Sequence, residues 1–283
     1  MIAPGVWVDG RAEGLPADDR GLAYGDGVFE TVLCVDGRPV WWDAHLSRLE
    51  RGAAVLGFVA PERDVWQRDA ERALAHADPG AARCVLKLLL TRGSGARGYA
   101  VRAPSRPRRV VSIGPAPEVD GAAREGLRLR WCRTALAVQP ALAGIKHLNR
   151  LEQVLARQEW IEAEIDEGLM CDTQGRAVSA ISGNLLCLTR RGWLTPPVDQ
   201  AGIAGLCRAR LLAEGLVSEA ELRPDDVMAA EALAVCNSVR GILPVRQLDQ
   251  RGWAVGGALR DLQRALARLE AAFHHSFLDD ALA

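Results

Sequence analysis

The strand-like segments of this chain do not alternate with helices in strict βαβ order. Two early apolar segments, at 6–8 and 31–35, are each followed by an Asp-Gly pair, which favours the positive φ angles of a tight hairpin. Hairpins join antiparallel strands, whereas a doubly wound parallel sheet needs a crossover helix between successive strands. The order of the segments therefore predicts an α+β fold.

Helical spacing begins after the second hairpin, where Leu46, Leu49 and Ala53 recur on one face of a predicted helix that starts at Asp43. A second helix is predicted over 62–77. Further strands are predicted over 84–91, 109–114, 127–132, 168–172, 177–179, 185–189, 193–195 and 232–236, and further helices over 146–165, 205–215 and 257–274.

A stretch rich in proline and small residues divides the chain into two parts. We expect a small N-terminal α+β domain at 1–115, a linker at 116–121 and a larger C-terminal domain at 122–283. A chain of 283 residues accommodates two domains of this size. Such a chain buries enough surface to fold without a metal or disulfide.

Composition argues against several classes of partner. With 35 basic and 36 acidic residues, the chain has no charge excess that would attract nucleic acid or an anionic membrane. The seven cysteines lack zinc-ligand or redox-pair spacing, which indicates no metal site and a reducing compartment. The N-terminus lacks signal-peptide features and no apolar run reaches membrane-spanning length, so we expect a cytoplasmic protein.

Four segments carry chemically useful residues, each with a plainer alternative. Residues 19–31 combine three glycines with three acids, which is also typical of a turn leading into a strand. Lys146 is either a solvated charge or a desolvated amine that can form a Schiff base. The small residues of 200–205 precede a predicted helix, where free N–H groups suit a phosphate, although many helices begin after glycine. Ser238 can reach the same phosphate or cap a turn.

Together and in this order, these segments resemble the branched-chain and D-amino-acid aminotransferase family of pyridoxal-phosphate enzymes, the fold type IV group. The similarity extends from about Asp18 to Val245. Two longer segments, 144–153 (GIKHLNRLEQ) and 91–99 (TRGSGARGY), are in addition similar to those of the aminodeoxychorismate lyases within this family.

The resemblance implies a small N-terminal domain, a larger barrel-like C-terminal domain and pyridoxal 5'-phosphate in the cleft between them. It also implies a homodimer whose second subunit lines part of the site. Lys146 would hold the cofactor covalently and Arg48 would bind its phosphate, since a guanidinium fork matches phosphate geometry. The other implied cofactor contacts are Ser179, Asn184, the backbone N–H groups of Ile203 and Ala204, and the hydroxyl of Ser238.

Ser179 departs from the family pattern, which usually has a glutamate five residues before the asparagine that corresponds to Asn184. A carboxylate there keeps the pyridine nitrogen protonated and makes the cofactor a strong electron sink. A serine hydroxyl can instead donate to an unprotonated nitrogen, which gives a weaker sink, unless another acid enters the site. Because a lyase that forms an aromatic product demands less of the cofactor, Ser179 favours a lyase over a transaminase.

The expected substrate is a dicarboxylate, so an arginine should bind it. Arg97 is the leading candidate, with Tyr99 beside it, in a loop whose glycines would let Arg97 close over the substrate; the alternative is a solvated loop charge. The expected reaction converts 4-amino-4-deoxychorismate to 4-aminobenzoate and pyruvate in folate biosynthesis. Two alternatives remain, a D-amino-acid or branched-chain aminotransferase and a paralogue that binds the cofactor without turnover.

Overall fold

The computed structural model describes residues 5–77, 81–95, 98–101 and 104–279. The chain forms two compact units, each described by itself below. Unit 1 comprises Met1–Ala116 together with Ile145–Arg150, and unit 2 comprises Pro117–Gly144 together with Leu151–Ala283.

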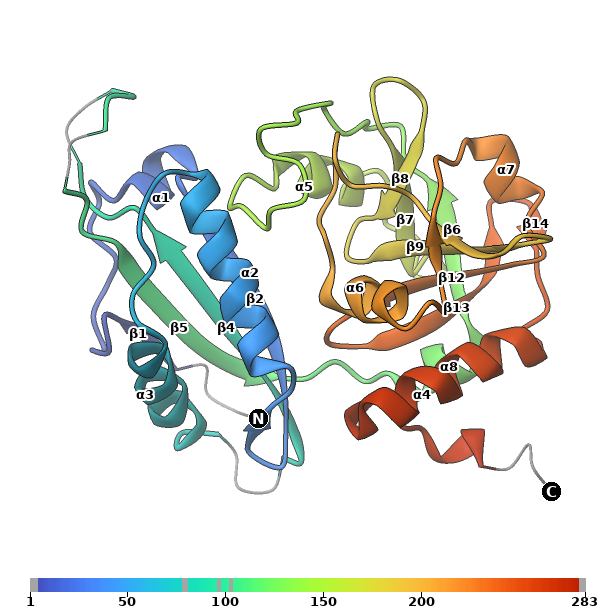
Figure 1. The fold of residues 1–283 in the computed structure, drawn as a ribbon, viewed down its shortest axis with the longest axis horizontal. Coiled ribbons are helices and arrows are strands. Elements are labelled where there is room, and N and C mark those ends of the chain that lie inside the picture. The colour runs from blue at the N-terminus through green and yellow to red at the C-terminus, as the bar shows by residue number, and fades with distance from the viewer. Residues whose placement is uncertain (1–4, 78–80, 96–97, 102–103, 280–283) are drawn as a thin grey trace. The chain divides into compact units, whose positions relative to one another are not determined.

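Unit 1 is built on an antiparallel five-stranded sheet (Figure 1). Its strands, in spatial order, are β1 (Val6–Val8), β5 (Arg108–Pro115), β4 (Arg83–Thr91), β2 (Gly27–Val35) and β3 (Arg38–Pro39). Its helices are α1 (Arg20–Tyr24), α2 (Trp42–Val55) and α3 (Arg63–Leu74).

The core of unit 1 lies between this sheet and the helices α2 and α3. Successive side chains of a strand point to opposite faces, so Val28 and Val32 of β2 share the face that the helices cover. Leu46 and Leu49 of α2 and Trp66 of α3 pack against that face and are almost fully buried. The predicted apolar face of α2 is therefore the one that the structure buries.

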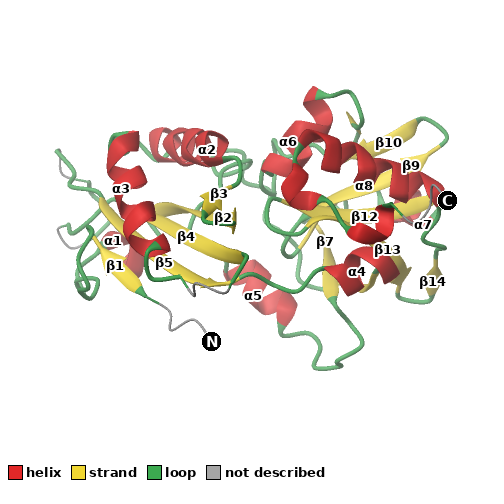
Figure 2. Cartoon of the chain, turned by 90° about the horizontal axis from the view of Figure 1, so that it is seen from below, coloured by secondary structure: helices red, strands yellow, loops and turns green. Residues whose placement is uncertain are grey.

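Unit 2 contains a nine-stranded mixed sheet that closes on itself (Figures 1 and 2). Strands β9, β12, β13, β6, β7 and β8 form a ring, because β8 also pairs with β9. The strands are β6 (Leu127–Trp131), β7 (Glu167–Cys171), β8 (Ala177–Ala180), β9 (Asn184–Thr189), β10 (Gly192–Thr195), β11 (Ser218–Glu219), β12 (Ala232–Asn237), β13 (Gly241–Leu248) and β14 (Arg251–Gly252). The helices are α4 (Asp120–Glu125), α5 (Leu151–Arg157), α6 (Leu206–Ala213), α7 (Pro224–Met228) and α8 (Gly257–Leu269), followed by 3₁₀ turns at Ala271–Phe273 and Ser276–Leu278.

The predicted α+β class and the barrel-like sheet are confirmed. The helix predicted over 146–165 is wrong, because only Leu151–Arg157 is helical and Lys146 lies in extended chain. The strand β13 was not predicted; Pro244, which has no N–H to donate, lies inside it. The last long helix ends at Leu269 rather than at residue 274.

The division into units differs from the expected domains in one segment. Ile145–Arg150 lies beyond the expected linker but belongs to unit 1. The reason is a pair of backbone hydrogen bonds to β2: the N–H of Phe29 donates to the Lys146 carbonyl, and the N–H of Leu148 donates to the Gly27 carbonyl, both at 2.9 Å.

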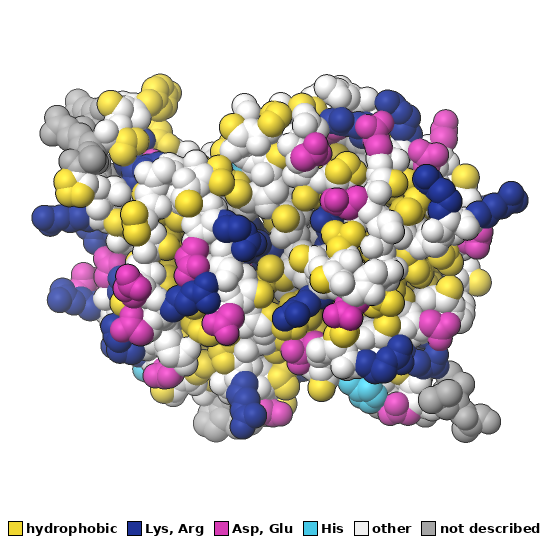
Figure 3. Space-filling model, in the orientation of Figure 1, with side chains coloured by type: hydrophobic (Ala, Val, Ile, Leu, Met, Phe, Trp, Pro, Cys, Tyr) yellow, Lys and Arg dark blue, Asp and Glu magenta, His cyan; other side chains and the backbone are white. Residues whose placement is uncertain are grey.

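The surface carries charges of both signs. Figure 3 shows basic and acidic side chains interspersed on the face drawn, as the near-zero net charge leads one to expect. Among the described residues, no helix combines the length and the apolar character that a membrane span requires.

Candidate active site

Lys146 lies against β2 in unit 1. The two backbone hydrogen bonds to Phe29 and Gly27 hold its segment in an extended conformation. Its ammonium nitrogen is 4.2 Å from the centroid of the Phe29 ring, a contact between a cation and an aromatic face. Phe29 and Glu30 are consecutive in β2, so their side chains leave opposite faces of the sheet, with Glu30 on the helix-covered side.

Glu30 is the centre of a buried ionic cluster. Arg48 of α2 grips its carboxylate with a fork, at 2.7 Å from Nε to Oε1 and 2.5 Å from Nη2 to Oε2. His45 lies one turn earlier on α2, and its Nδ1 is 2.6 Å from Oε2 of Glu30. Glu30 and His45 are both fully buried. A carboxylate so far from water is retained because each oxygen has a charged or hydrogen-bonding partner.

The cluster changes the ionisation of its members. Burial alone would raise the pKa of Glu30, but the charge and hydrogen bonds of Arg48, with a smaller effect of His45, outweigh it and lower that pKa to about 2. Burial lowers the pKa of His45, although Glu30 opposes the shift. Among the described residues, Nε2 of His45 is buried without a hydrogen-bond partner, as suits a neutral ring that donates from Nδ1.

The pKa of Lys146 is the one that matters most for the chemistry of the site. Removal of its ammonium from water is the largest cause, the positive charge of Arg48 adds to it, and together they lower its pKa to about 7 against the partial opposition of Glu30. At neutral pH a large fraction of the amine is unprotonated, whereas an ordinary lysine is almost entirely charged. The shift favours the desolvated amine over a solvated surface charge, and such an amine suits a nucleophile or base.

The predicted role of Arg48 in binding phosphate stays a prediction. The structure places its guanidinium on Glu30, in a pair of opposite charges that largely offset each other. That fork also fixes the orientation of the guanidinium, which a ligand site needs.

Unit 2 brings three predicted residues to one end of its closed sheet. Ser179 of β8 pairs with Asn184, the first residue of β9, and this pair closes the ring of strands. Asn184 in turn lies opposite Cys236 near the end of β12, one residue before Asn237. The side-chain oxygen of Asn237 accepts from the N–H groups that follow Ser238, at 3.0 and 2.8 Å, and this turn holds the buried Ser238 at the same sheet end.

The turn at 202–205 is fastened to this end of the sheet. The side-chain N–H of Asn184 donates to the Ile203 carbonyl at 2.9 Å. The N–H of Ala204 donates to the Gly144 carbonyl at 3.0 Å, so this predicted phosphate donor is already engaged, while the Ile203 N–H takes no part in that pairing. A Cβ on Gly205 would lie 2.0 Å from Oδ1 of Asn184, so any larger residue where α6 begins would displace the Asn184 side chain.

The strand pairing of Ser179 shows what surrounds it. Its partner on the other side is Met170 of β7. Glu167, the buried carboxylate of that strand, is bonded to Ser182 and lies 3.3 Å from Arg240. The carboxylate of Glu167 is thus already bonded to Ser182 and Arg240.

The predicted substrate residues lie in the loop after β4. Arg97 lies outside the described residues. Tyr99 is described, and it is 86% exposed. Glu30 and His45 were missed at the level of sequence, yet one signal was present: Glu30 alternates with Val28 and Val32, which places it on the core face.

The chain belongs to the amino-transferase class IV family, whose profile matches residues 27–248. An aminodeoxychorismate lyase from Vibrio harveyi is 32% identical over 248 residues, which is 84% of this chain and 89% of that protein. The solved structure of 4-amino-4-deoxychorismate lyase from Pseudomonas aeruginosa has 42% sequence identity and a TM-score of 0.86, and the match covers 93% of this chain and 98% of that chain. A D-alanine aminotransferase from Bacillus licheniformis is 24% identical over 267 residues, 88% of this chain and 89% of that protein. The family resemblance expected from the sequence is confirmed.

Proposed function

We propose that this chain is a pyridoxal-phosphate-dependent lyase that converts 4-amino-4-deoxychorismate to 4-aminobenzoate and pyruvate, a reaction of folate biosynthesis. The observation that carries the proposal is the position of the Lys146 amine, which the pairing of its segment with β2 holds 4.2 Å from the centroid of the Phe29 ring. Burial there, with the charge of Arg48, lowers its pKa to about 7, which provides a nucleophile at neutral pH. Similarity to two aminodeoxychorismate lyases supports this choice of substrate.

The donor set of the chain fits pyridoxal phosphate. Lys146 offers the amine that reacts with an aldehyde. The helix α6 begins directly after Gly205, and the free N–H groups of a helix N-terminus suit a phosphate. The missing Cβ of Gly205 leaves the room that Asn184 occupies beside this helix start. We assign the Ile203 N–H and the Ser238 hydroxyl to that phosphate.

Two further residues complete the proposed cofactor contacts. Arg48 supplies a guanidinium whose direction Glu30 fixes, and we assign it to the phosphate as the family resemblance implies. Ser179 faces the pyridine nitrogen in this proposal, where its hydroxyl donates a hydrogen bond to the unprotonated nitrogen.

Pyridoxal phosphate, when bound, supplies an aldehyde that condenses with amines and a ring that accepts electrons. Lys146 removes the proton from the substrate carbon that bears the amine, which its neutral form does without first losing a proton to water. The bond from the adjacent carbon to the enolpyruvyl oxygen then breaks, and the carbon ring becomes aromatic. The enolpyruvate that leaves takes up a proton on carbon and becomes pyruvate. Because aromatisation favours this elimination, a serine at position 179 suffices where a transaminase would gain from a carboxylate.

The two substrate carboxylates need cationic or hydrogen-bonding partners. We assign Arg97 and Tyr99 to them. Tyr99 presents an exposed side chain, as a substrate contact requires. Replacing Arg97 by alanine should raise the Michaelis constant and leave the cofactor spectrum unchanged; an unchanged Michaelis constant would remove Arg97 from this role.

We infer a cytoplasmic homodimer from the family resemblance. The apolar side chains Leu151, Val154 and Leu155 of α5 are 75%, 48% and 54% exposed, which suits a surface covered by a second copy. Light scattering of the purified protein tests the dimer, and a monomer at micromolar concentration would contradict it.

The proposed reaction is tested by measuring pyruvate and 4-aminobenzoate released from 4-amino-4-deoxychorismate. The wild type should release both in equal amounts, and Lys146→Ala should release neither. Borohydride should fix the cofactor to the wild type and to Lys87→Ala, a matched control because Lys87 is exposed and contacts the same Phe29 ring at 5.7 Å. An aminotransferase would be favoured instead if D-alanine converted the cofactor stably to its aminated form and 4-amino-4-deoxychorismate released no pyruvate.

A further inference from the structure

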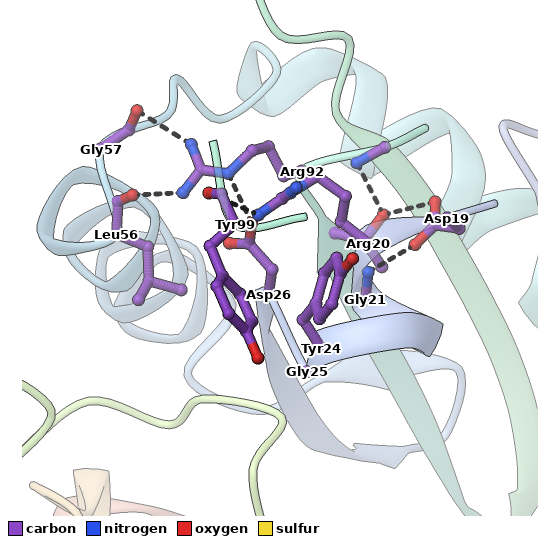
Figure 4. Close-up of polar contacts among 12 residues, drawn as sticks. Asp19, Arg20, Gly21, Tyr24, Gly25, Asp26, Leu56, Gly57, Arg92 and Tyr99 are labelled. Atoms are coloured by element: carbon purple, nitrogen blue, oxygen red, sulfur yellow. Dashed lines mark hydrogen bonds and ion pairs between the residues drawn. The ribbon is translucent and has the colours of Figure 1, made fainter. Parts of the chain in front are cut away.

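Arg20 is a buried arginine that the proposed chemistry does not use. It lies in α1, is 6% exposed and donates from Nε to Oδ2 of Asp26 at 2.8 Å. Its two other nitrogens donate to the carbonyls of Gly98 at 3.0 Å and of Tyr99 at 3.4 Å. Figure 4 shows Arg20 together with Asp26, Tyr24 and Tyr99. One guanidinium therefore ties α1 to the backbone of the loop that carries Tyr99.

Tyr24 makes a second tie from the same helix. Its hydroxyl accepts a hydrogen bond from the N–H of Gly98 at 3.2 Å, and its ring centroid is 5.6 Å from that of Tyr99. Arg20 also lies over the Tyr24 ring, at 4.9 Å from the centroid. Both polar backbone groups of Gly98 are thus bonded to side chains of α1.

The beginning of the loop is held by the same part of the chain. The N–H of Arg20 donates to the Gly93 carbonyl at 3.0 Å, and the Ser94 hydroxyl donates to Asp18 at 2.8 Å. A Cβ on Gly95 would lie 2.8 Å from Cδ of Arg20, so the loop packs closely on the aliphatic stem of the arginine. Residues 18–24 therefore bond the loop on both sides, at residues 93–94 and at residues 98–99.

The backbone of Tyr99 is held by Arg20, whereas Tyr99 as a residue is 86% exposed and its side chain is open to solvent. We propose that Arg20 is a positioning residue that fixes the backbone of Gly98 and Tyr99, so that Tyr99 is presented to the substrate in a defined place before binding. A loop ordered in advance loses less conformational entropy when it binds a ligand. This inference rests on the proposed function, because it takes the substrate of Tyr99 to be 4-amino-4-deoxychorismate.

Arg92 provides a matched control. It bonds the same oxygen of Asp26, at 2.7 Å from its Nε, and its side chain is about as buried as that of Arg20. Its remaining nitrogens donate to the carbonyls of Leu56 and Gly57 at the end of α2, not to the loop. Replacing Arg92 therefore disturbs the same carboxylate without removing a bond to Gly98 or Tyr99.

The test compares Arg20→Lys, Tyr24→Phe and Arg92→Lys as holoenzymes. Lysine keeps the charge beside Asp26 but cannot reproduce the guanidinium fork. We expect Arg20→Lys to raise the Michaelis constant about tenfold, the effect of losing one charge-assisted hydrogen bond, with the turnover number and cofactor spectrum nearly unchanged. Backbone hydrogen exchange at Gly98 should accelerate in the same variant. Tyr24→Phe should raise the Michaelis constant and the exchange rate at Gly98 by about two- to threefold each. This variant tests the positioning of the loop if Arg20→Lys does not fold.

Four results would overturn the inference. An unchanged Michaelis constant in Arg20→Lys with faster exchange at Gly98 would make Arg20 a structural anchor only. An equal rise in Arg92→Lys would assign the effect to general loss of stability. A wild type that releases no pyruvate would remove the proposed function together with this role, whereas an active wild type with an unaffected Arg20→Lys would remove this role alone.

Discussion

Glu30→Gln is the sharpest test of the buried cluster, because the substitution keeps the shape of the side chain and removes its charge. Glu30 is fully buried, receives the fork of Arg48 and accepts a hydrogen bond from Nδ1 of His45. The variant leaves Arg48 buried without a carboxylate. Breaking a buried ion pair from one side costs about 3–5 kcal/mol of the free energy of unfolding.

The pKa of Glu30 gives an independent magnitude. Its value falls from 4.5 to about 2 on folding, which corresponds to roughly 3 kcal/mol of stability at neutral pH. Since the folded pKa is the lower one, this stability is fully present above pH 4.5 and is lost as the pH falls toward 2. The wild type should therefore lose its advantage over Glu30→Gln within that window.

Urea unfolding at several pH values measures the effect, and Glu50→Gln is its control. Glu50 receives the same kind of fork from Arg63, at 2.7 and 2.8 Å, but the two side chains are 37% and 43% exposed. Water screens such a pair, so Glu50→Gln should cost only a small fraction of the Glu30→Gln loss. Equal losses in both variants, or a Glu30→Gln loss that does not change between pH 4.5 and 2, would refute the reasoning.

Three further predictions concern the candidate site. Lys146→Met should stabilise the cofactor-free protein at pH 7 by up to about 4 kcal/mol, because the folded amine has a pKa of about 7 and the unfolded one about 10.5. In urea unfolding this gap should close as the pH rises toward 10.5, and a constant gap would contradict the pKa. Ser179→Glu should speed conversion of the cofactor by D-alanine about tenfold in a stopped-flow half-reaction, whereas Ser179→Ala should not. Gly205→Ala should weaken pyridoxal-phosphate binding at least about tenfold in a fluorescence titration, because its Cβ meets Asn184 at 2.0 Å; Gly257→Ala, which has open space around a Cβ, should bind normally.

The spacing of apolar residues predicted those helices and strands whose buried face can be read from their own sequence. The apolar positions of α2 and the alternating buried residues Cys84, Leu86, Leu88 and Leu90 of β4 were enough, because each element packs with the spacing that its own sequence shows. The same reasoning failed at Lys146. Residues 146–148 take their hydrogen bonds from β2, a strand far earlier in the chain, and no window around Lys146 contains that partner.

Part of the candidate site was predicted from the sequence and part of it was not. Lys146 came from a short motif, and the structure adds two causes that lower its pKa, burial of the amine first and the nearby charge of Arg48 second. Glu30 and His45 looked like ordinary strand and helix residues, because their pairing depends on how α2 lies on β2. The anchoring of Tyr99 by Arg20 was also invisible, since it joins residues nearly eighty positions apart.

The pairing of residues 146–148 with β2 has a consequence for how the chain folds during synthesis. An N-terminal fragment that ends at Ala116 contains every strand of the five-stranded sheet, yet the Phe29 N–H and the Gly27 carbonyl still lack the partners that Lys146 and Leu148 provide. An unpaired strand edge attracts other chains. The ribosome must therefore deliver the chain through Arg150, including the first strand of unit 2, before unit 1 can cover that edge. The segment that carries Lys146 is thus the last part of unit 1 to be synthesised, and its arrival completes the sheet edge before Ser179, Asn184 and Ser238 of unit 2 exist.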